Sequence, residues 1–349
     1  MQTFKKILFP SIAFLLFLLI FSSVIIEPWI RSENTYYLDS KLREKLDGTI
    51  DCLVVGSSQG MTGFVPQIID DELGTNSFNL SNVAMKMHGR LFMLQKELPL
   101  NPVDTVIIDI SHDALTKENI NNYGNGDAVT YARLGNAKDK ISYLIKAIDC
   151  DDWLNIYSRN LMSGVVFWRD KIFGKGKNEV NYSAKGYHTQ GTSDNCLKEE
   201  DIVSKYNAST IVKPIKDETL DELNEILELC RQKNCRVICV TLPVTDALLW
   251  ENSDWDDFSR WITDYCKERG CEYYDFNLLK EKTGFLSDKT SFFDSTHLGD
   301  QGAKDFTCAF CSVIKKVNSG EDVSGLFYSG YEEMKQHSPY MEYYFSHVQ

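Results

Sequence analysis

The order of apolar runs and amphipathic stretches along the chain predicts strands that alternate with helices. Short apolar runs bounded by polar residues or glycine have the length and composition of buried strands. They are residues 52–55, 77–80, 105–110, 236–242 and 271–275. Stretches with helical periodicity separate or follow them: 61–73, 83–98, 217–233, 257–269 and 300–317. This alternation is the signature of a doubly wound parallel sheet with helices on both faces.

The alternation is interrupted by one long segment. Residues 113–215 mix short helical stretches with polar loops and contain no βα repeat. Such a segment is typical of an insertion that acts as a lid or a substrate-binding element. We therefore divide the chain into an N-terminal anchor, a linker helix, one α/β domain with this insertion, and an aromatic-rich tail that packs on the sheet, binds a partner or lies near the membrane. Their bounds are 1–30, 31–50, 51–318 and 319–349.

The start of the chain has the pattern of a membrane anchor. Residues 7–26 carry no charge and are long enough to span a bilayer as a helix. The run is longer than the apolar part of a cleaved signal peptide, and more apolar residues follow its only small-residue stretch. Lys5 and Lys6 precede the run and Glu27 follows it, which predicts a cytoplasmic N-terminus. We expect a single-pass protein of the cell membrane whose globular domain is extracytoplasmic.

Charge and cysteine spacing exclude some functions. The net charge of −13 argues against nucleic-acid binding, which needs clustered Lys and Arg. The C-x-x-C at residues 308–311 has no second pair at zinc spacing, so we expect no metal and no cofactor. Cys230 with Cys235, and Cys266 with Cys271, would form local disulfides only in an oxidising compartment, which the sequence leaves open.

The strongest candidate for chemistry is the turn after the first predicted strand. In residues 51–60, DCLVVGSSQG, an apolar run stops at Gly56 and a small polar turn leads into a helix. Open α/β sheets bind their ligands at such corners, where the N–H groups that open a helix receive negative charge. Ser58 could present its hydroxyl there as a nucleophile. The alternative is that Gly-Ser-Ser is only a βα turn.

A second polar motif lies just before the last predicted helix. In DSTHLGDQGA, Asp294 and His297 are three residues apart, so the carboxylate can reach its own imidazole in a loop. That contact would fix the tautomer and leave Nε2 to act as a base. Asp300 is the expected helix cap, which leaves Asp294 available. With Ser58, the pair completes the set needed for acyl transfer; otherwise both are loop and cap residues.

Chain order separates two kinds of serine hydrolase. Gly56-x-Ser58-x-Gly60 matches the nucleophile elbow of α/β-hydrolases, but that elbow usually follows several strands. Here the serine follows the first strand, and the acid and base share one segment. This arrangement resembles the SGNH, or GDSL, hydrolase superfamily over about residues 50–112 and 217–316.

The resemblance rests on two motifs and implies both a fold and a triad. VVGSSQG resembles the first block of the family and DSTHLGDQGA resembles the last. The implied fold is a flavodoxin-like three-layer α/β sandwich with about five parallel strands, here with a transmembrane helix and an insertion. The implied catalytic residues are Ser58, His297 and Asp294.

The middle blocks depart from the family pattern. Ser81 stands where the second block normally supplies a glycine N–H to the oxyanion hole, and the backbone donor survives that change. The third block normally carries an asparagine, whereas DISHD has none and leaves Ser111 or His112 as substitutes. The resemblance therefore implies an oxyanion hole made by the N–H groups of Ser58 and Ser81, with the Asn82 amide as a further donor.

The anchor, the insertion and these departures narrow the resemblance to one branch of the superfamily. The chain is similar to membrane-anchored SGNH-like proteins of bacterial envelope biogenesis, such as the DltD-like proteins of teichoic-acid D-alanylation. This implies acyl transfer to a cell-envelope polysaccharide or teichoic-acid-like polymer, beside a multi-span membrane O-acyltransferase. Two alternatives stay open: an esterase that removes O-acetyl groups from envelope glycans, and a non-catalytic scaffold of envelope biogenesis.

Overall fold

The computed structural model of the 349-residue chain consists of two compact units, which we describe separately. The smaller unit comprises residues 1–45 and 123–179, and the larger unit comprises 46–122 and 180–349. The described residues are 35–111, 126–172, 182–191, 217–251, 255–282 and 290–337, with a few isolated positions elsewhere.

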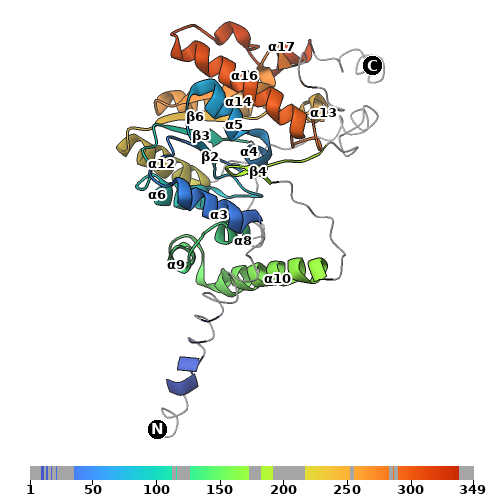
Figure 1. Ribbon diagram of the computed structural model, residues 1–349. Helices are drawn as coiled ribbons and strands as arrows, with labels where there is room; N and C mark the ends of the chain where they lie inside the picture. Colours follow the sequence, from blue (N-terminus) through green and yellow to red (C-terminus); the bar gives the residue numbers. More distant parts are fainter. Residues whose placement is uncertain are drawn as a thin grey trace. The chain divides into compact units, whose positions relative to one another are not determined.

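The larger unit is built on a five-stranded parallel sheet (Figure 1). Its strands are β1 (Cys52–Val55), β2 (Ser77–Asn79), β3 (Thr105–Asp109), β6 (Arg236–Thr241) and β7 (Glu272–Asp275). They lie in the order β2-β1-β3-β6-β7, and every pairing is parallel. This is the flavodoxin-like order, in which the chain reverses direction across the sheet between β1 and β3. The predicted parallel α/β sheet is therefore confirmed.

Helices cover both faces of this sheet. On one face, the side chains of Val54, Ile107 and Val240 belong to a core that includes the residues of two helices. These helices are α5 (Pro66–Leu73) and α16 (Asp300–Asn318). The opposite face is covered by α6 (Met87–Glu97), α12 (Asp217–Gln232) and α14 (Trp255–Glu268). Burial on both faces explains why the central strands β1, β3 and β6 are mainly apolar and do not alternate with polar residues.

One predicted helix is in fact two. In place of a single helix over 61–73, α4 (Ser58–Gly63) ends before α5 begins at Pro66. Proline lacks an N–H and disfavours helical geometry in the residue before it, but it suits the first position of a new helix. The first helix also starts earlier than expected, which makes Ser58 its first residue.

The described helices of the smaller unit come from the linker and the insertion. They are α3 (Thr35–Leu46), α8 (Gly126–Ala132), α9 (Ala137–Ala147) and α10 (Trp153–Ile172). A buried ion pair between Arg133 and Asp39 holds α3 against the segment after α8. A hairpin made of β4 (Tyr182–Ala184) and β5 (Tyr187–His188) also derives from the insertion but belongs to the larger unit.

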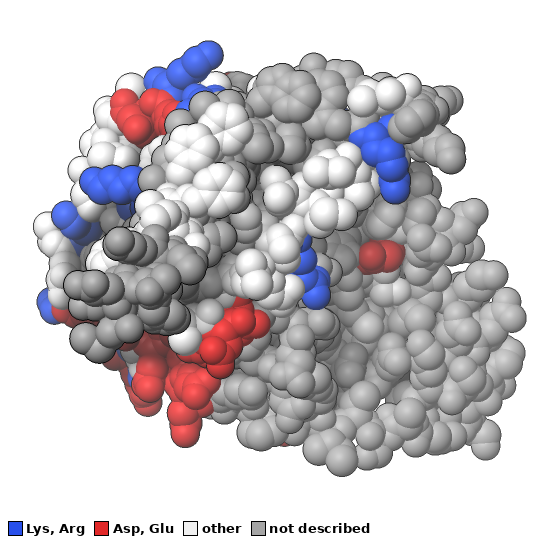
Figure 2. Space-filling model, turned by 90° about the horizontal axis from the view of Figure 1, so that it is seen from below, with Lys and Arg blue, Asp and Glu red and all other residues white. Residues whose placement is uncertain are grey.

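The predicted membrane anchor stays a prediction. Within the described parts of the chain, no helix combines the length and the apolar character needed to cross a bilayer. Most of residues 7–26 lie outside those parts. Figure 2 shows one face of the molecule, on which the described Lys and Arg side chains lie at several separate places while acidic side chains gather mainly in one area.

The first part of the C-terminal tail packs on the larger unit. Helix α17 (Tyr331–Lys335) inserts Tyr331 and Met334 into an apolar cluster with Val244 and Leu249. The Tyr331 hydroxyl donates to Asp275 Oδ2 at 2.7 Å, and burial together with this carboxylate raises the pKa of Tyr331. Of the three roles considered for the tail, the described residues thus support packing on the domain.

Candidate active site

The structure brings together three predicted residues from opposite ends of the domain. Ser58 Oγ lies 2.7 Å from His297 Nε2. On the other side of the ring, His297 Nδ1 lies 2.8 Å and 2.9 Å from the two carboxylate oxygens of Asp294. The side chains of His297 and Asp294 are 23% and 30% exposed, so a substrate can reach the ring. Nucleophile, base and orienting carboxylate thus form one continuous hydrogen-bonded chain.

The nucleophile turn leaves one backbone donor available. Ser57 caps α4, and its hydroxyl and carbonyl oxygens accept the N–H groups of Gln59 and Met61. The N–H of Gly60 donates to Asp109 Oδ2 at 3.2 Å. The N–H of Ser58 forms no hydrogen bond with any described residue. A negative oxygen developing on a carbonyl attacked by Ser58 would therefore meet this N–H first.

A buried carboxylate holds this turn in place through hydrogen bonds. Asp109 ends β3, is fully buried, and accepts through Oδ2 from the Ser57 N–H at 2.9 Å and the Ser57 hydroxyl at 2.8 Å. With the Gly60 N–H, three donors converge on one oxygen. A Cβ at Gly56 would lie 2.4 Å from Asp109 Cβ, which explains the glycine in Gly-Ser-Ser. No motif identifies Asp109; its signal in the sequence is an acidic residue at the carboxyl end of an otherwise apolar strand.

Arg90 holds the end of β3 from the helix side. Its guanidinium, buried in α6, donates to the backbone carbonyls of Asp109 and Met85. Burial lowers the pKa of Arg90, and the negative charge of Asp109 acts in the opposite direction. This contact fixes the backbone from which the Asp109 carboxylate reaches the nucleophile turn.

The loop that carries the base is held together by hydrogen bonds from its backbone to the Asp294 side chain. Asp294 Oδ1 accepts the N–H groups of Thr296 and His297, each at 2.8 Å. Burial tends to raise the pKa of Asp294, but the hydrogen bond from His297 and those from the backbone outweigh it and hold the pKa well below its ordinary value. A carboxylate that stays charged orients the imidazole and stabilises the imidazolium that forms during proton transfer.

Two contacts that the sequence does not predict align this loop with its neighbours. Gln59, next to the nucleophile, donates its side-chain amide to Thr296 O at 2.9 Å. Thr245, after β6, donates its N–H to Ser295 O at 3.1 Å. Neither contact follows from a sequence motif, because each joins segments that are distant in the sequence. Together they fix the distance between nucleophile and base.

Asp300 has a different role from the one expected. Gly299 is the N-cap of α16, and Asp300 is its first residue. The Asp300 carboxylate accepts the hydroxyl of Tyr187 at 3.1 Å, while its N–H donates to Gln190 O at 2.8 Å. Burial and the Asp300 charge raise the pKa of Tyr187. The residue thus fastens the β4–β5 hairpin of the insertion beside the base-bearing loop.

The other predicted oxyanion donors are used differently. The Ser81 N–H donates to Asn79 Oδ1 at 3.0 Å, because the buried Asn79 side chain is held by the Gly60 and Phe64 carbonyls. The N–H of Asn82 donates to Gly56 O at 3.3 Å. The Ser81 N–H is therefore used within its own loop and does not serve as the expected oxyanion donor. A role for the Asn82 side-chain amide stays a prediction. Of the third-block substitutes, Ser111 is buried and His112 lies outside the described residues.

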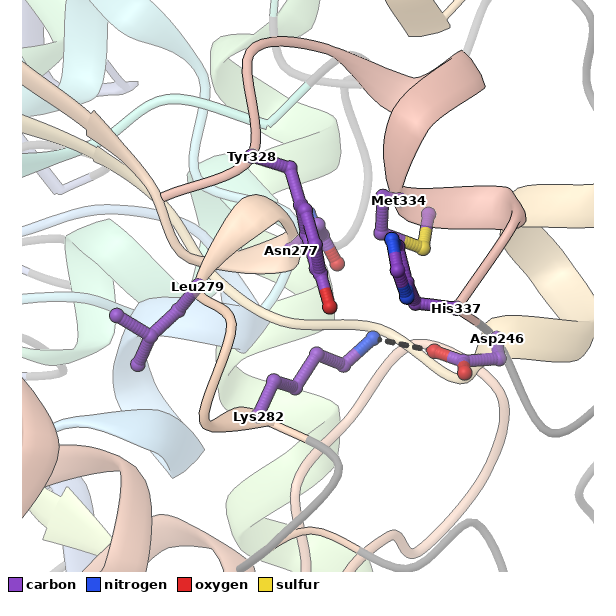
Figure 3. Close-up of a pocket in the computed structure, with 7 residues that line it drawn as sticks. All are labelled: Asp246, Asn277, Leu279, Lys282, Tyr328, Met334 and His337. Carbon is purple, nitrogen blue, oxygen red and sulfur yellow. Dashed lines mark hydrogen bonds and ion pairs between the residues drawn. The ribbon is translucent and has the colours of Figure 1, made fainter. Parts of the chain in front are cut away.

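A small cavity near the tail is separate from the triad. It is lined by Asp246, Asn277, Leu279, Lys282, Tyr328, Met334 and His337 (Figure 3). The Lys282 ammonium donates to Asp246 Oδ1 at 2.8 Å and to Val244 O at 2.7 Å. The buried charges of this cavity are thus paired with each other, which indicates a structural role.

Comparison with known proteins gives similarity at the level of structure. No protein-family model matches the chain, and no curated protein matches it. A GDSL-like lipase from Bacteroides thetaiotaomicron matches 81% of this chain and 98% of its own, with 11% identity and a TM-score of 0.38. A provisionally assigned acylhydrolase from Bacteroides fragilis matches 83% and 98%, with 9% identity and a TM-score of 0.37. These scores are too low to support a functional argument, which therefore rests on the geometry of the site.

Proposed function

We propose that the protein is a serine-dependent enzyme that cleaves an ester through an acyl-enzyme on Ser58. The observation that supports this most directly is the chain of contacts from Ser58 Oγ to His297 Nε2, at 2.7 Å, and from His297 Nδ1 to Asp294, at 2.8 Å. A nucleophile, a base and a residue that orients the base are the parts that acyl transfer needs.

The residues divide the chemistry as follows. His297 takes the proton of the Ser58 hydroxyl while Ser58 Oγ bonds to the acyl carbon, and the carbonyl oxygen becomes negative beside the Ser58 N–H. The ester bond then breaks, and His297 gives its proton to the departing alcohol. Water or an acceptor hydroxyl next loses a proton to His297 and attacks the acyl-enzyme. Breaking the acyl–Ser58 bond returns that proton to Ser58 and restores the enzyme.

The group that attacks the acyl-enzyme decides whether the protein is a hydrolase, with water as acceptor, or a transferase, with a polymer hydroxyl as acceptor. Of the three predicted donor residues, only Ser58 has a backbone N–H that forms no hydrogen bond with the described residues, and removing one donor from a complete hole typically slows acyl transfer by about 10²–10³. We infer that the isolated enzyme is slow towards water and that a partner or a polymer acceptor completes the site. Transfer to a cell-envelope polysaccharide or teichoic-acid-like polymer is the main proposal, and esterase action on envelope glycans is the alternative.

Two features support a location at the cell membrane. The uncharged run at residues 7–26 is long enough to anchor the chain, with the domain outside the cytoplasm. Helix α10 carries exposed apolar side chains along one stripe, among them Leu154, Met162 and Ile172, suited to an apolar environment. A multi-span membrane O-acyltransferase would be the matching partner for transfer.

A serine-reactive fluorophosphonate probe tests the proposal. We expect wild-type protein to be labelled, Ser58→Ala to be unlabelled, and Ser57→Ala to be labelled more slowly, because it loses the cap of α4 and a bond to Asp109 but keeps the nucleophile. Ser57 is the matched control because it is the adjacent serine, but its hydroxyl is bonded to Asp109. Labelling that persists in Ser58→Ala would refute the assignment, and a wild-type protein without labelling would favour the scaffold alternative. Rapid turnover of simple acetyl esters by wild-type protein would favour hydrolysis over transfer.

A further inference from the structure

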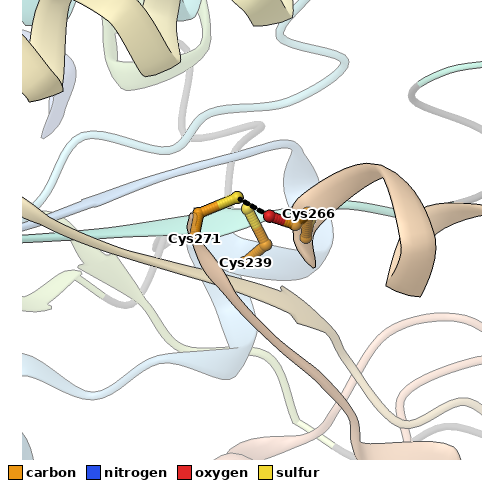
Figure 4. A group of neighbouring side chains, drawn as sticks. All are labelled: Cys239, Cys266 and Cys271. Atoms are coloured by element: carbon orange, nitrogen blue, oxygen red, sulfur yellow. Dashed lines mark hydrogen bonds between the residues drawn. The ribbon is translucent and has the colours of Figure 1, made fainter. Parts of the chain in front are cut away.

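Three cysteines converge on one face of the sheet, away from the triad residues. Cys239 lies on β6, Cys266 in the last turn of α14, and Cys271 directly before β7. Their Sγ atoms all lie within 4.8 Å of one another (Figure 4). Cys239 and Cys266 are buried, whereas Cys271 is partly exposed. The cluster is therefore closed towards the core and open on the Cys271 side.

The local fold explains two of the three cysteines. Cys271 N–H donates to Cys266 O at 3.0 Å, and Gly270 adopts a φ of +67°, which is the closure that commonly ends an α-helix. Residues at these two positions often make an apolar contact, so the pair alone needs no further function. Cys239 is different, because it reaches the pair from the sheet and does not belong to the helix end.

A second helix end provides an internal comparison. At the end of α12, Cys235 N–H donates to Cys230 O at 2.9 Å, with Asn234 at a φ of +57°. Cys235 Sγ donates to Val103 O at 3.1 Å. Within the described residues, the group of three potential ligands includes neither Cys230 nor Cys235. The same closure thus occurs without a third convergent thiol.

The charges around the trio favour a cation held by thiolates. The guanidinium of Arg269 lies 3.6 Å from the centre of the Tyr265 ring and donates to Asn224 Oδ1 at 2.7 Å. The Cys271 thiol donates to Cys266 O at 3.4 Å, which holds its Sγ beside the other two. Three thiolates around a divalent ion carry one net negative charge, and Arg269, two residues before Cys271, contributes a positive charge to this segment although it also lies 3.6 Å from Glu268. The carbonyl end of α14 also favours a cation.

We propose that Cys239, Cys266 and Cys271 form a binding site for one thiophilic divalent cation of the zinc class. Thiolates prefer such ions, and Zn–S bonds of about 2.3 Å need only a small contraction of the cluster. Binding replaces three S–H bonds with three metal–sulfur bonds and releases three protons to solvent. The fourth position, on the exposed side of Cys271, is taken by water. The ion joins β6, α14 and β7 and so stabilises this edge of the sheet.

Zinc titration of the reduced, full-length protein against a chromophoric zinc chelator tests the proposal. We expect one tightly bound Zn²⁺ in the wild type, at least ~100-fold weaker binding in Cys271→Ser, and unchanged binding in the matched control Cys235→Ser. Co²⁺ should give the absorption bands of tetrahedral thiolate coordination in the wild type and the control only. Circular dichroism verifies that Cys271→Ser is folded, and Cys266→Ser provides a second variant.

Three results would overturn the site. The first is a wild-type protein that takes up no Zn²⁺ beyond the amount bound by Cys271→Ser. The second is equal weakening by the control Cys235→Ser, which would indicate scattered binding by surface thiols. The third is a Cys266–Cys271 disulfide, found by peptide mass analysis of protein purified without reductant, because that bond would consume two of the ligands.

Discussion

Asp109 offers the most informative perturbation, because it supports the nucleophile turn without belonging to the triad. Asp109→Asn keeps the shape of the side chain but removes the charge on which three donors converge, at 2.8, 2.9 and 3.2 Å. A hydrogen bond to a charged group contributes about 1.5–3 kcal/mol, against about 0.5–1.5 kcal/mol for a neutral one. Three such reductions would sum to about 3–4.5 kcal/mol; since neighbouring bonds are not additive, we expect a smaller loss of about 2–3 kcal/mol.

Urea unfolding measures this loss, and the rate of fluorophosphonate labelling reports the position of Ser58. We expect Asp109→Asn to unfold at lower urea and, where still folded, to label more slowly than the wild type. Asp104→Asn is the matched control, because Asp104 lies just before the same strand but is exposed. If Asp109→Asn matches this control in both assays, the carboxylate does not hold the turn and our account of it is wrong.

Two further predictions concern the base-bearing loop and the insertion. Asp294→Asn should reduce labelling of Ser58 by about 10³–10⁴ through loss of the correct imidazole tautomer; labelling at the wild-type rate would contradict the triad. Because the pKa of Asp294 is lowered by folding, its contribution to stability is present above about pH 4 and is lost at lower pH, so the stability gap between wild type and Asp294→Asn should close in acid. Gly186→Ala should destabilise the larger unit, since Gly186 has a φ of +86° and a Cβ there would lie 1.8 Å from a carbonyl oxygen of β2. Gly191→Ala, which meets nothing within 4 Å, should leave the melting temperature unchanged, and equal melting temperatures for both variants would refute this role of the hairpin.

The parts of the fold that follow from local pattern could be predicted from the sequence. The three central strands β1, β3 and β6 are short, mainly apolar runs with mostly buried residues, and the ends of all five strands agree with the prediction to within a residue. The proximity of Asp294 and His297 was also predictable, because their spacing alone allows the contact. Pro66 indicates the break between α4 and α5. The helical periodicity continues across this break, however, and by itself predicts a single helix.

The parts that escaped prediction depend on contacts between distant segments. Asp109 and Gln59 support the site through partners that are far away in sequence or that have no fixed spacing. The Cys239 thiol meets Cys266 and Cys271 only because β6 and β7 are neighbours in the sheet. The use of the Ser81 N–H inside its own loop follows from the buried Asn79 amide, whose orientation no sequence pattern specifies.

The construction of the nucleophile turn bears on the choice between a lone esterase and a partner-dependent transferase. The residue that fixes the turn is a carboxylate, and its second oxygen, Asp109 Oδ1, forms no hydrogen bond with the described residues. A carboxylate offers no hydrogen-bond donor to the attacked carbonyl, whereas an asparagine would offer one. The geometry that prepares Ser58 to attack therefore does little to stabilise the resulting oxyanion. An enzyme whose nucleophile is well placed but whose oxyanion is poorly stabilised gains most from a hydrogen-bond donor supplied by its acceptor or partner. This is the arrangement expected of a transferase that avoids hydrolysing its own acyl-enzyme.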